Sequence, residues 1–354
     1  MTVAIAQLRE MHGAYRRASA KRGAILTVAV LCLAGLILVD LTTGPSGVPV
    51  ADVWTGLKAG PYGDDRTLAI ILWQLRMPQT SMGVLVGACL GLAGLQMQTI
   101  LNNPLASPFT LGFSAAAGFG AALAIMFGGI LPVPPYLLAP FCAFTMTLVA
   151  CGLVYAITRL CSATPEVLVL GGIAVLFLFQ SMQSLLQFLA SPELLQQIVF
   201  WLFGSLLKST WTSVAVTGAI LAACLPFVIR SAWALTTLRL GDGNARTLGL
   251  SVETVRRDTF VVVALLTAAA VAFVGTIGFV GLIAPHGARA LVGEDHRFSL
   301  PLSAMTGGIV LLGASVFGKF ISPGAVIPVG IITAVVGVPM LFAVIVRGRG
   351  NGAP

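Results

Sequence analysis

The sequence carries very little charge. Asp, Glu, Lys and Arg together make up 9% of its 354 residues, whereas a soluble domain carries about 25%. So few charged side chains cannot cover a globule of this size with a solvated surface, which excludes a soluble protein. With 57% hydrophobic residues, the chain instead has the composition of a protein that crosses a membrane many times.

Motifs for nucleotide, metal and disulfide chemistry are missing as well. The phosphate-binding pattern GxxxxGK followed by Ser or Thr does not occur, so no nucleotide site is expected on this chain. The six cysteines form no CxxC pair and the three histidines make no ligand pair at helical spacing, so we expect neither a disulfide framework nor a metal site. Without a catalytic cluster, we expect no enzymatic activity and no directly bound cofactor.

Carboxylates within the apolar segments are nearly absent. Asp40 and Glu166 are the exceptions, and both fall near the ends of predicted crossings. A transporter driven by protons or sodium usually has an ionisable residue at mid-depth. This absence argues against a stand-alone secondary transporter of a polar solute, which is kept as the alternative function. A non-transporting membrane scaffold or enzyme is a third and weaker hypothesis.

Apolar segments of membrane-spanning length follow one another along the chain. The predicted fold is an all-α polytopic membrane protein with about ten transmembrane helices. We place them at residues 24–43, 77–100, 109–128, 136–157, 166–189, 212–229, 258–274, 277–292, 300–319 and 328–346. A further amphipathic segment, residues 198–211, is too short to span and reads as an interfacial or re-entrant helix.

The distribution of basic residues sets the orientation. With both termini in the cytoplasm, fifteen of the 20 Lys and Arg residues lie inside, as cytoplasmic loops prefer. The net charge of +8 is therefore attributed to membrane topology, and no nucleic acid partner is expected. The predicted topology divides the chain into a basic cytoplasmic tail (1–23), a single transmembrane domain (24–346) and a second cytoplasmic tail (347–354). The transmembrane domain includes a cytoplasmic loop (230–257).

Polar residues share one face of the fifth predicted crossing. Gln180, Gln183, Ser184 and Gln187 lie three, four and seven residues apart, which places them along one helix stripe. Amides are costly in a bilayer unless they face protein or water, so the stripe predicts either interhelical hydrogen bonds or the lining of a pathway for a large polar substrate. We favour the pathway, because three glutamines exceed what helix adhesion needs.

Two glycine-rich stretches and one loop complete the pattern. Gly83, Gly87 and Gly91 repeat every four residues, so they form a smooth groove for another helix. Glycines at 275, 278 and 281 precede Pro285, which indicates a short, broken crossing packed against protein. Residues 238–250 of the inner loop read as short helices lying flat, a surface that fits a partner protein.

Several of these motifs occur together in one known family. The chain resembles the permease subunits of type II ABC importers for iron-siderophores, haem and cobalamin, the FecCD type. The resemblance is carried by Leu75-Arg-Met-Pro78, Gly87-Ala-Cys-Leu-Gly-Leu-Ala-Gly94, Asn103-Pro-Leu-Ala-Ser-Pro108, Trp201-Leu-Phe-Gly-Ser-Leu206, Leu240-Gly-Asp242, Gly278-Phe-Val-Gly-Leu-Ile-Ala-Pro-His286, Asp295-His-Arg297 and Pro328-Val-Gly330. These motifs run in consistent order from about residue 75 to the C-terminus.

The resemblance implies a function and a set of partners. It implies a multi-pass protein of the bacterial cytoplasmic (inner) membrane that imports a metal chelate by alternating access, a ferric siderophore being favoured over haem or cobalamin. The expected partners are a second permease subunit, identical or paralogous, two ATP-binding subunits, an extracytoplasmic substrate-binding protein and membrane lipid. ATP would bind to the partner subunits.

The resemblance also assigns residues to roles. Asn103 and Leu105 fall at the cytoplasmic gate. The ATPase would dock on the loop at residues 239–251, through Leu240, Gly241, Ala245, Arg246, Leu248 and Gly249. Arg76 and Lys319 fall where the binding protein docks. The sequence departs from the family pattern at Gln79, where a second basic residue is frequent, and at Ser315, where aspartate is common.

Overall fold

The computed structural model describes residues 2–45, 47–130, 134–161, 164–322 and 327–350, and every regular element in these ranges is helical. The long helices are α1 (Thr2–Thr42), α4 (Met77–Ile100), α5 (Phe113–Phe127), α6 (Pro135–Cys161), α7 (Pro165–Leu189), α9 (Trp211–Leu238), α11 (Val252–Val274), α12 (Val280–Val292), α13 (His296–Ile321) and α14 (Val329–Gly350). The short ones are α2 (Val50–Ala59), α3 (Arg66–Ala69), α8 (Pro192–Leu202), α10 (Asp242–Thr247), the π-helix η1 (Ile70–Arg76) and the 3₁₀ turns η2 (Pro108–Leu111) and η3 (Gly128–Ile130).

Seven of these helices are long and apolar enough to cross a membrane. They are Arg16–Thr42, Arg66–Ile100, Leu137–Cys161, Pro165–Leu189, Trp211–Leu238, Val252–Val274 and His296–Ile321. Three shorter apolar helices, Phe113–Phe127, Val280–Val292 and Val329–Phe342, accompany them. The all-helical membrane fold expected from the sequence is therefore confirmed, while the figure of ten crossings stays a prediction.

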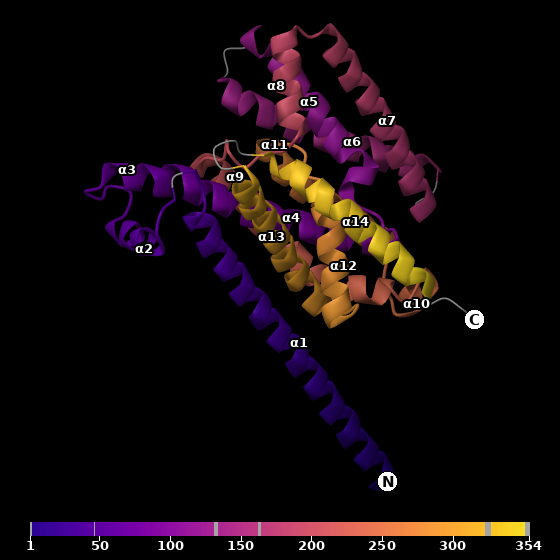
Figure 1. Cartoon of the computed structure of the whole chain (residues 1–354). Coiled ribbons are helices and arrows are strands. Elements are labelled where there is room, and N and C mark those ends of the chain that lie inside the picture. The colour runs from indigo at the N-terminus through magenta and orange to yellow at the C-terminus, as the bar shows by residue number, and fades with distance from the viewer. Residues whose placement is uncertain (1, 46, 131–133, 162–163, 323–326, 351–354) are drawn as a thin grey trace.

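Helices α4 and α11 lie at the centre of the protein (Figure 1). The glycine stripe of α4 packs against α13 of the same chain. A side chain at Gly87 would overlap the backbone of Gly307, and one at Gly91 would overlap the carbonyl oxygen of Ser303. Such close backbone approach is typical of membrane helix packing, so the stripe serves the protein's own fold.

Several helices extend beyond the predicted crossings. Helix α1 continues through the predicted tail at residues 2–23, and residues 66–76, which precede the crossing predicted at 77–100, are helical. The inner loop is shorter than expected, because α9 reaches Leu238 and α11 begins at Val252. The helix nearest the predicted interfacial or re-entrant segment at 198–211 is α8, which begins at Pro192 and ends at Leu202. Part of the predicted tail at 347–354 lies outside the described residues.

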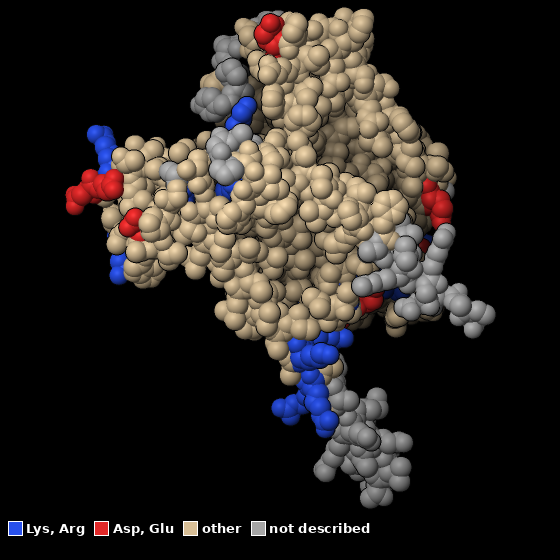
Figure 2. Space-filling model, in the orientation of Figure 1, with Lys and Arg blue, Asp and Glu red and all other residues tan. Residues whose placement is uncertain are grey.

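The two ends of the bundle differ in composition. Helices α2 and α3 lie beside the end of α1 at one side, and α10 and the end of α14 lie at the other (Figure 1). Lys and Arg gather on the stretch of α1 that projects from the body, where Arg16, Arg17 and Lys21 are exposed (Figure 2). This charge distribution supports a cytoplasmic location for the end that carries α10.

Candidate functional site

A cleft of about 520 Å³ opens between α5, α7, α8 and α14. Its polar side chains are Ser114, Gln180, Gln183 and Thr276, and apolar residues such as Leu176 and Val335 supply most of the remaining wall. Among the residues that the structure describes, none of those lining the cleft is ionisable. Clefts of this volume accommodate drug-sized organic ligands, so the space suits a bulky substrate that is held weakly by uncharged groups.

Interrupted helices form the floor of this cleft. Three connections meet there: the segment after α8, the break between α11 and α12, and the start of α14. They are joined by backbone hydrogen bonds from Ser205 to Val274 (2.7 Å) and from Gly330 to Gly204 (3.2 Å). Non-helical backbone at membrane depth is tolerated where it is buried in protein or lines a water-filled cavity. The breaks are thus consistent with an aqueous cleft at this position.

The structure divides the predicted glutamine stripe. Gln180 and Gln183 line the cleft, and Gln183 also packs closely against Gly118 of α5. Ser184 is exposed and Gln187 is half-buried, but neither contributes to the cleft wall. Half of the stripe therefore faces the cleft and half continues along α7 beyond it.

The predicted gate is a tight turn at the end of α4. Asn103 accepts a hydrogen bond through its side chain from the backbone N–H of Leu105 (2.9 Å), and its own N–H donates to the Gln98 carbonyl (3.1 Å). Both predicted gate residues are exposed, Leu105 to 42%. The preceding residue, Asn102, adopts a positive φ of 46°. The turn therefore presents Leu105 at the surface on a well-defined backbone.

The predicted coupling loop contains the short helix α10 between two glycines with positive φ, Gly241 and Gly249. Leu240 and Leu248 flank it and are 60% and 56% exposed, an unusual position for leucine unless a partner covers it. Arg246 pairs with Glu253 at the surface. Ala245, expected as a contact for the ATPase, is wholly buried in this chain, so it supports the loop from within.

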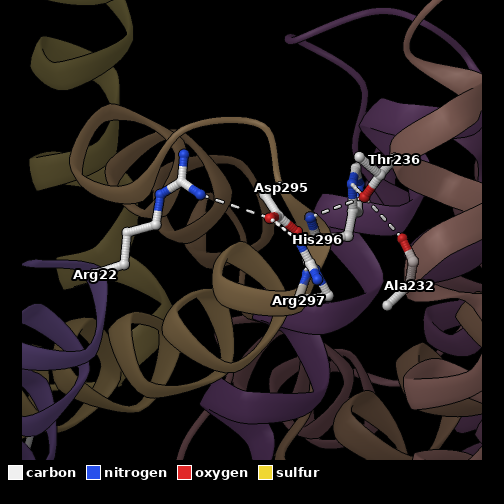
Figure 3. Close-up of polar contacts among 6 residues, drawn as sticks. All are labelled: Arg22, Ala232, Thr236, Asp295, His296 and Arg297. Atoms are coloured by element: carbon white, nitrogen blue, oxygen red, sulfur yellow. Dashed lines mark hydrogen bonds and ion pairs between the residues drawn. The ribbon is translucent and has the colours of Figure 1, made fainter. Parts of the chain in front are cut away.

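A polar cluster fastens the start of α13 to two other helices (Figure 3). Asp295 caps α13 and pairs with Arg22 of α1 (3.6 Å) and with Arg297 (2.8 Å). The hydrogen bonds from Arg297 are the main reason that the pKa of Asp295 lies below its ordinary value. The neighbouring His296 is buried, and its ring contacts the hydroxyls of Thr99 (2.8 Å) and Thr236 (3.2 Å).

The two cations predicted to dock the binding protein, Arg76 and Lys319, are buried in this chain. Arg76 is 5% exposed and donates to the Leu41 carbonyl (2.5 Å). The side chain of Lys319 is 9% exposed and pairs with Asp40 at 2.7 Å. Asp40 is itself 1% exposed and also binds the hydroxyl of Ser315 (2.8 Å). A carboxylate from α1 thus neutralises Lys319 and lies near Arg76, a partnership that the sequence did not indicate.

Within the described ranges, no group of three His, Cys, Asp or Glu side chains is placed to hold a metal ion.

The sequence profile of the FecCD transport family matches residues 31–347. The chain belongs to this family. It is 33% identical over 345 residues to the Fe(3+)-citrate import system permease protein YfmD of Bacillus subtilis, covering 96% of this chain and 98% of YfmD. It is 35% identical over 335 residues to the cobalamin import system permease protein BtuC of Halobacterium salinarum, covering 91% and 89%.

A solved structure agrees with the sequence comparisons. The FecCD chain superposes with a TM-score of 0.82 and 28% identity on a protein described as a metal-chelate type ABC transporter in an inward-facing conformation. The superposition covers 92% of this chain and 99% of the other. The resemblance inferred from the motifs is therefore confirmed at the level of family and fold.

Proposed function

We propose that this FecCD chain is the membrane-spanning permease subunit of an ATP-driven importer for a metal chelate. The observation that carries the proposal is the open cleft with uncharged polar walls and interrupted helices at its floor. Relatives named as permeases for ferric citrate and cobalamin support it, because both cargoes are metals already enclosed by organic ligands. We propose a ferric siderophore or a related ferric chelate as cargo, with haem and cobalamin as alternatives.

The cleft opens at the protein surface, so a second permease subunit is proposed to close it from the other side. The same assembly would include two ATP-binding subunits, which dock on the permease loops through Leu240 and Leu248. A substrate-binding protein would bind at the opposite face. The seven long and three shorter apolar helices support ten crossings of the bacterial inner membrane, with both termini inside. A stand-alone secondary transporter remains the competing function.

Cysteine labelling tests the pathway. Single cysteines at Gln180 and Gln183, in a chain whose native cysteines are replaced, should react with an aqueous thiol reagent, and ATP should change the rate in the assembled complex. A cysteine at Phe177, which is 61% exposed on α7 but outside the cleft wall, is the matched control and should resist the reagent. If the cysteines at positions 180 and 183 both resist the thiol reagent in every nucleotide state, the pathway prediction is contradicted.

Uptake into proteoliposomes then separates the two functions and the cargoes. With the ATPase and binding protein present, import of a ferric chelate should require ATP. The rates of import of ferric chelate, haem and cobalamin are compared in the same preparation. Uptake that proceeds from an ion gradient without the ATPase would instead favour the secondary transporter.

A further inference from the structure

One buried arginine joins the loop that contains α10 to the end of α4. Arg256 lies in the first turns of α11 and is 7% exposed. Two of its nitrogens donate to the two carboxylate oxygens of Asp242, both at 2.8 Å. Its third nitrogen, Nε, donates to the backbone carbonyl of Ile100 at 3.1 Å. A single planar guanidinium is thus shared between the first residue of α10 and the last residue of α4.

The attachment to Ile100 occurs where the backbone needs a partner. The last carbonyl groups of a helix have no partner within the helix, and a cation at that end is favourable. Arg256 supplies both at the end of α4, while it holds Asp242 in a bidentate geometry that lysine cannot reproduce. The link is therefore directional and involves a buried arginine, whereas both side chains of the Arg246–Glu253 pair on the same loop are more than half exposed.

A second arginine makes a parallel connection. Arg239, which directly precedes the loop, donates to the side chain of Asn102 (3.1 Å) and to Glu294 (3.1 Å). Asn102 lies between the end of α4 and the predicted gate residues, and its positive φ is held by this contact and by its own N–H bond to Thr99. Residues on both sides of α10 therefore hold the same turn.

We infer that Arg256 is a positioning residue that transmits displacement of α10 to the Asn103–Leu105 turn. The inference rests on the proposed function, in which an ATPase moves the loop and the turn gates the pathway. Since Arg256 bonds to both α10 and α4, a shift of Asp242 changes the position of the group that fixes Ile100. The Asn103–Leu105 turn begins three residues after Ile100, so it moves with Ile100.

The test compares two neighbouring arginines in the assembled transporter. Arg256→Gln should leave the ATPase bound and hydrolysis within about twofold of wild type, while the amount of cargo imported per ATP falls about tenfold, the range of an allosteric coupling. In a Leu105→Cys background with the native cysteines replaced, nucleotide-dependent labelling should also be lost. Arg257→Gln is the control: Arg257 is half-exposed and pairs with Asp258, so both readouts should be unchanged.

The outcomes are distinguishable. A wild-type ratio of import to hydrolysis in Arg256→Gln, with normal labelling of position 105, overturns the inference. If labelling of position 105 does not depend on nucleotide even with Arg256 present, the proposed gate fails and the inference fails with it. Should Arg256→Gln not fold, Asp242→Asn decides, because its side chain is 40% exposed and the Arg256–Ile100 bond survives: partial uncoupling supports the link, and full coupling refutes it.

Discussion

Replacing Asp40 by asparagine removes the negative charge that lies beside Lys319 and Arg76, while keeping the side chain's shape. Lys319, with 9% of its side chain exposed, then stays buried without its counter-ion, and Arg76 loses a nearby opposite charge. Breaking a buried ion pair by removing one partner costs about 3–5 kcal/mol. We therefore expect Asp40→Asn to lower the free energy of unfolding by about that amount.

A double-mutant cycle isolates the pair. Lys319→Met alone should also destabilise the protein, because the buried carboxylate loses its cation. The double variant should recover part of the loss, since replacing both charges of a buried pair is often close to neutral. The cycle should give a coupling energy of about 1–3 kcal/mol, measured by reversible SDS denaturation in mixed micelles.

An exposed carboxylate provides the control. Asp52 lies in the first turn of α2 and is exposed, so Asp52→Asn should change the free energy of unfolding by less than about 0.5 kcal/mol. If Asp40→Asn costs no more than this control, the cluster is not a buried counter-ion site.

Two further predictions concern the cytoplasmic end. Because the pKa of Asp295 in the folded protein lies below its ordinary value of 3.8, its ionised form stabilises the fold above that pH, and the contribution is lost as the pH falls through the lowered pKa. Asp295→Asn keeps a good helix cap but loses the ion pairs with Arg22 and Arg297, so it should cost up to about 1 kcal/mol at neutral pH. Denaturation curves recorded at decreasing pH should show the difference from wild type shrinking, whereas a constant difference would refute the assignment. Leu248→Asp should leave the permease folded but abolish co-purification of the ATPase, whereas Ala245→Asp buries a charge and should reduce the yield of folded protein itself. Size-exclusion profiles separate the two effects. A well-folded Ala245→Asp variant that only loses its ATPase would contradict this distinction.

The sequence predicted helices best where a proline or a polar residue marks their ends. Helix α7 was expected at 166–189 and begins at Pro165, because Thr164 caps it and proline suits the first turn. Helices extend beyond the predicted crossings where charged residues continue them past the apolar run, as in α1 and in Arg66–Ala69. Arginine and lysine are good helix formers, so the loss of hydropathy marks the edge of the membrane and not the end of the helix.

The site was predictable only as far as it depends on local spacing. The glutamine stripe follows from helical periodicity, and two of its members do line the cleft. The polar clusters could not be found this way, since Asp40 meets Lys319 and Arg256 meets Ile100 across long stretches of chain. The burial of Arg76 and Lys319 could not be predicted for the same reason, because a counter-ion on another helix leaves no periodic signal in the sequence.

The departure at Ser315 has a structural counterpart that bears on how the protein moves. Where aspartate is common in the family, Ser315 bonds to Asp40, so the carboxylate beside Lys319 comes from α1 and not from α13 itself. At the other end of α13, its cap Asp295 pairs with Arg22, which lies midway along α1 and stacks on Phe298. If the two helices slid past each other, the buried Lys319–Asp40 pair would separate and leave its charges without a partner. We therefore expect α1 to move with α13 as one body when the cleft opens and closes.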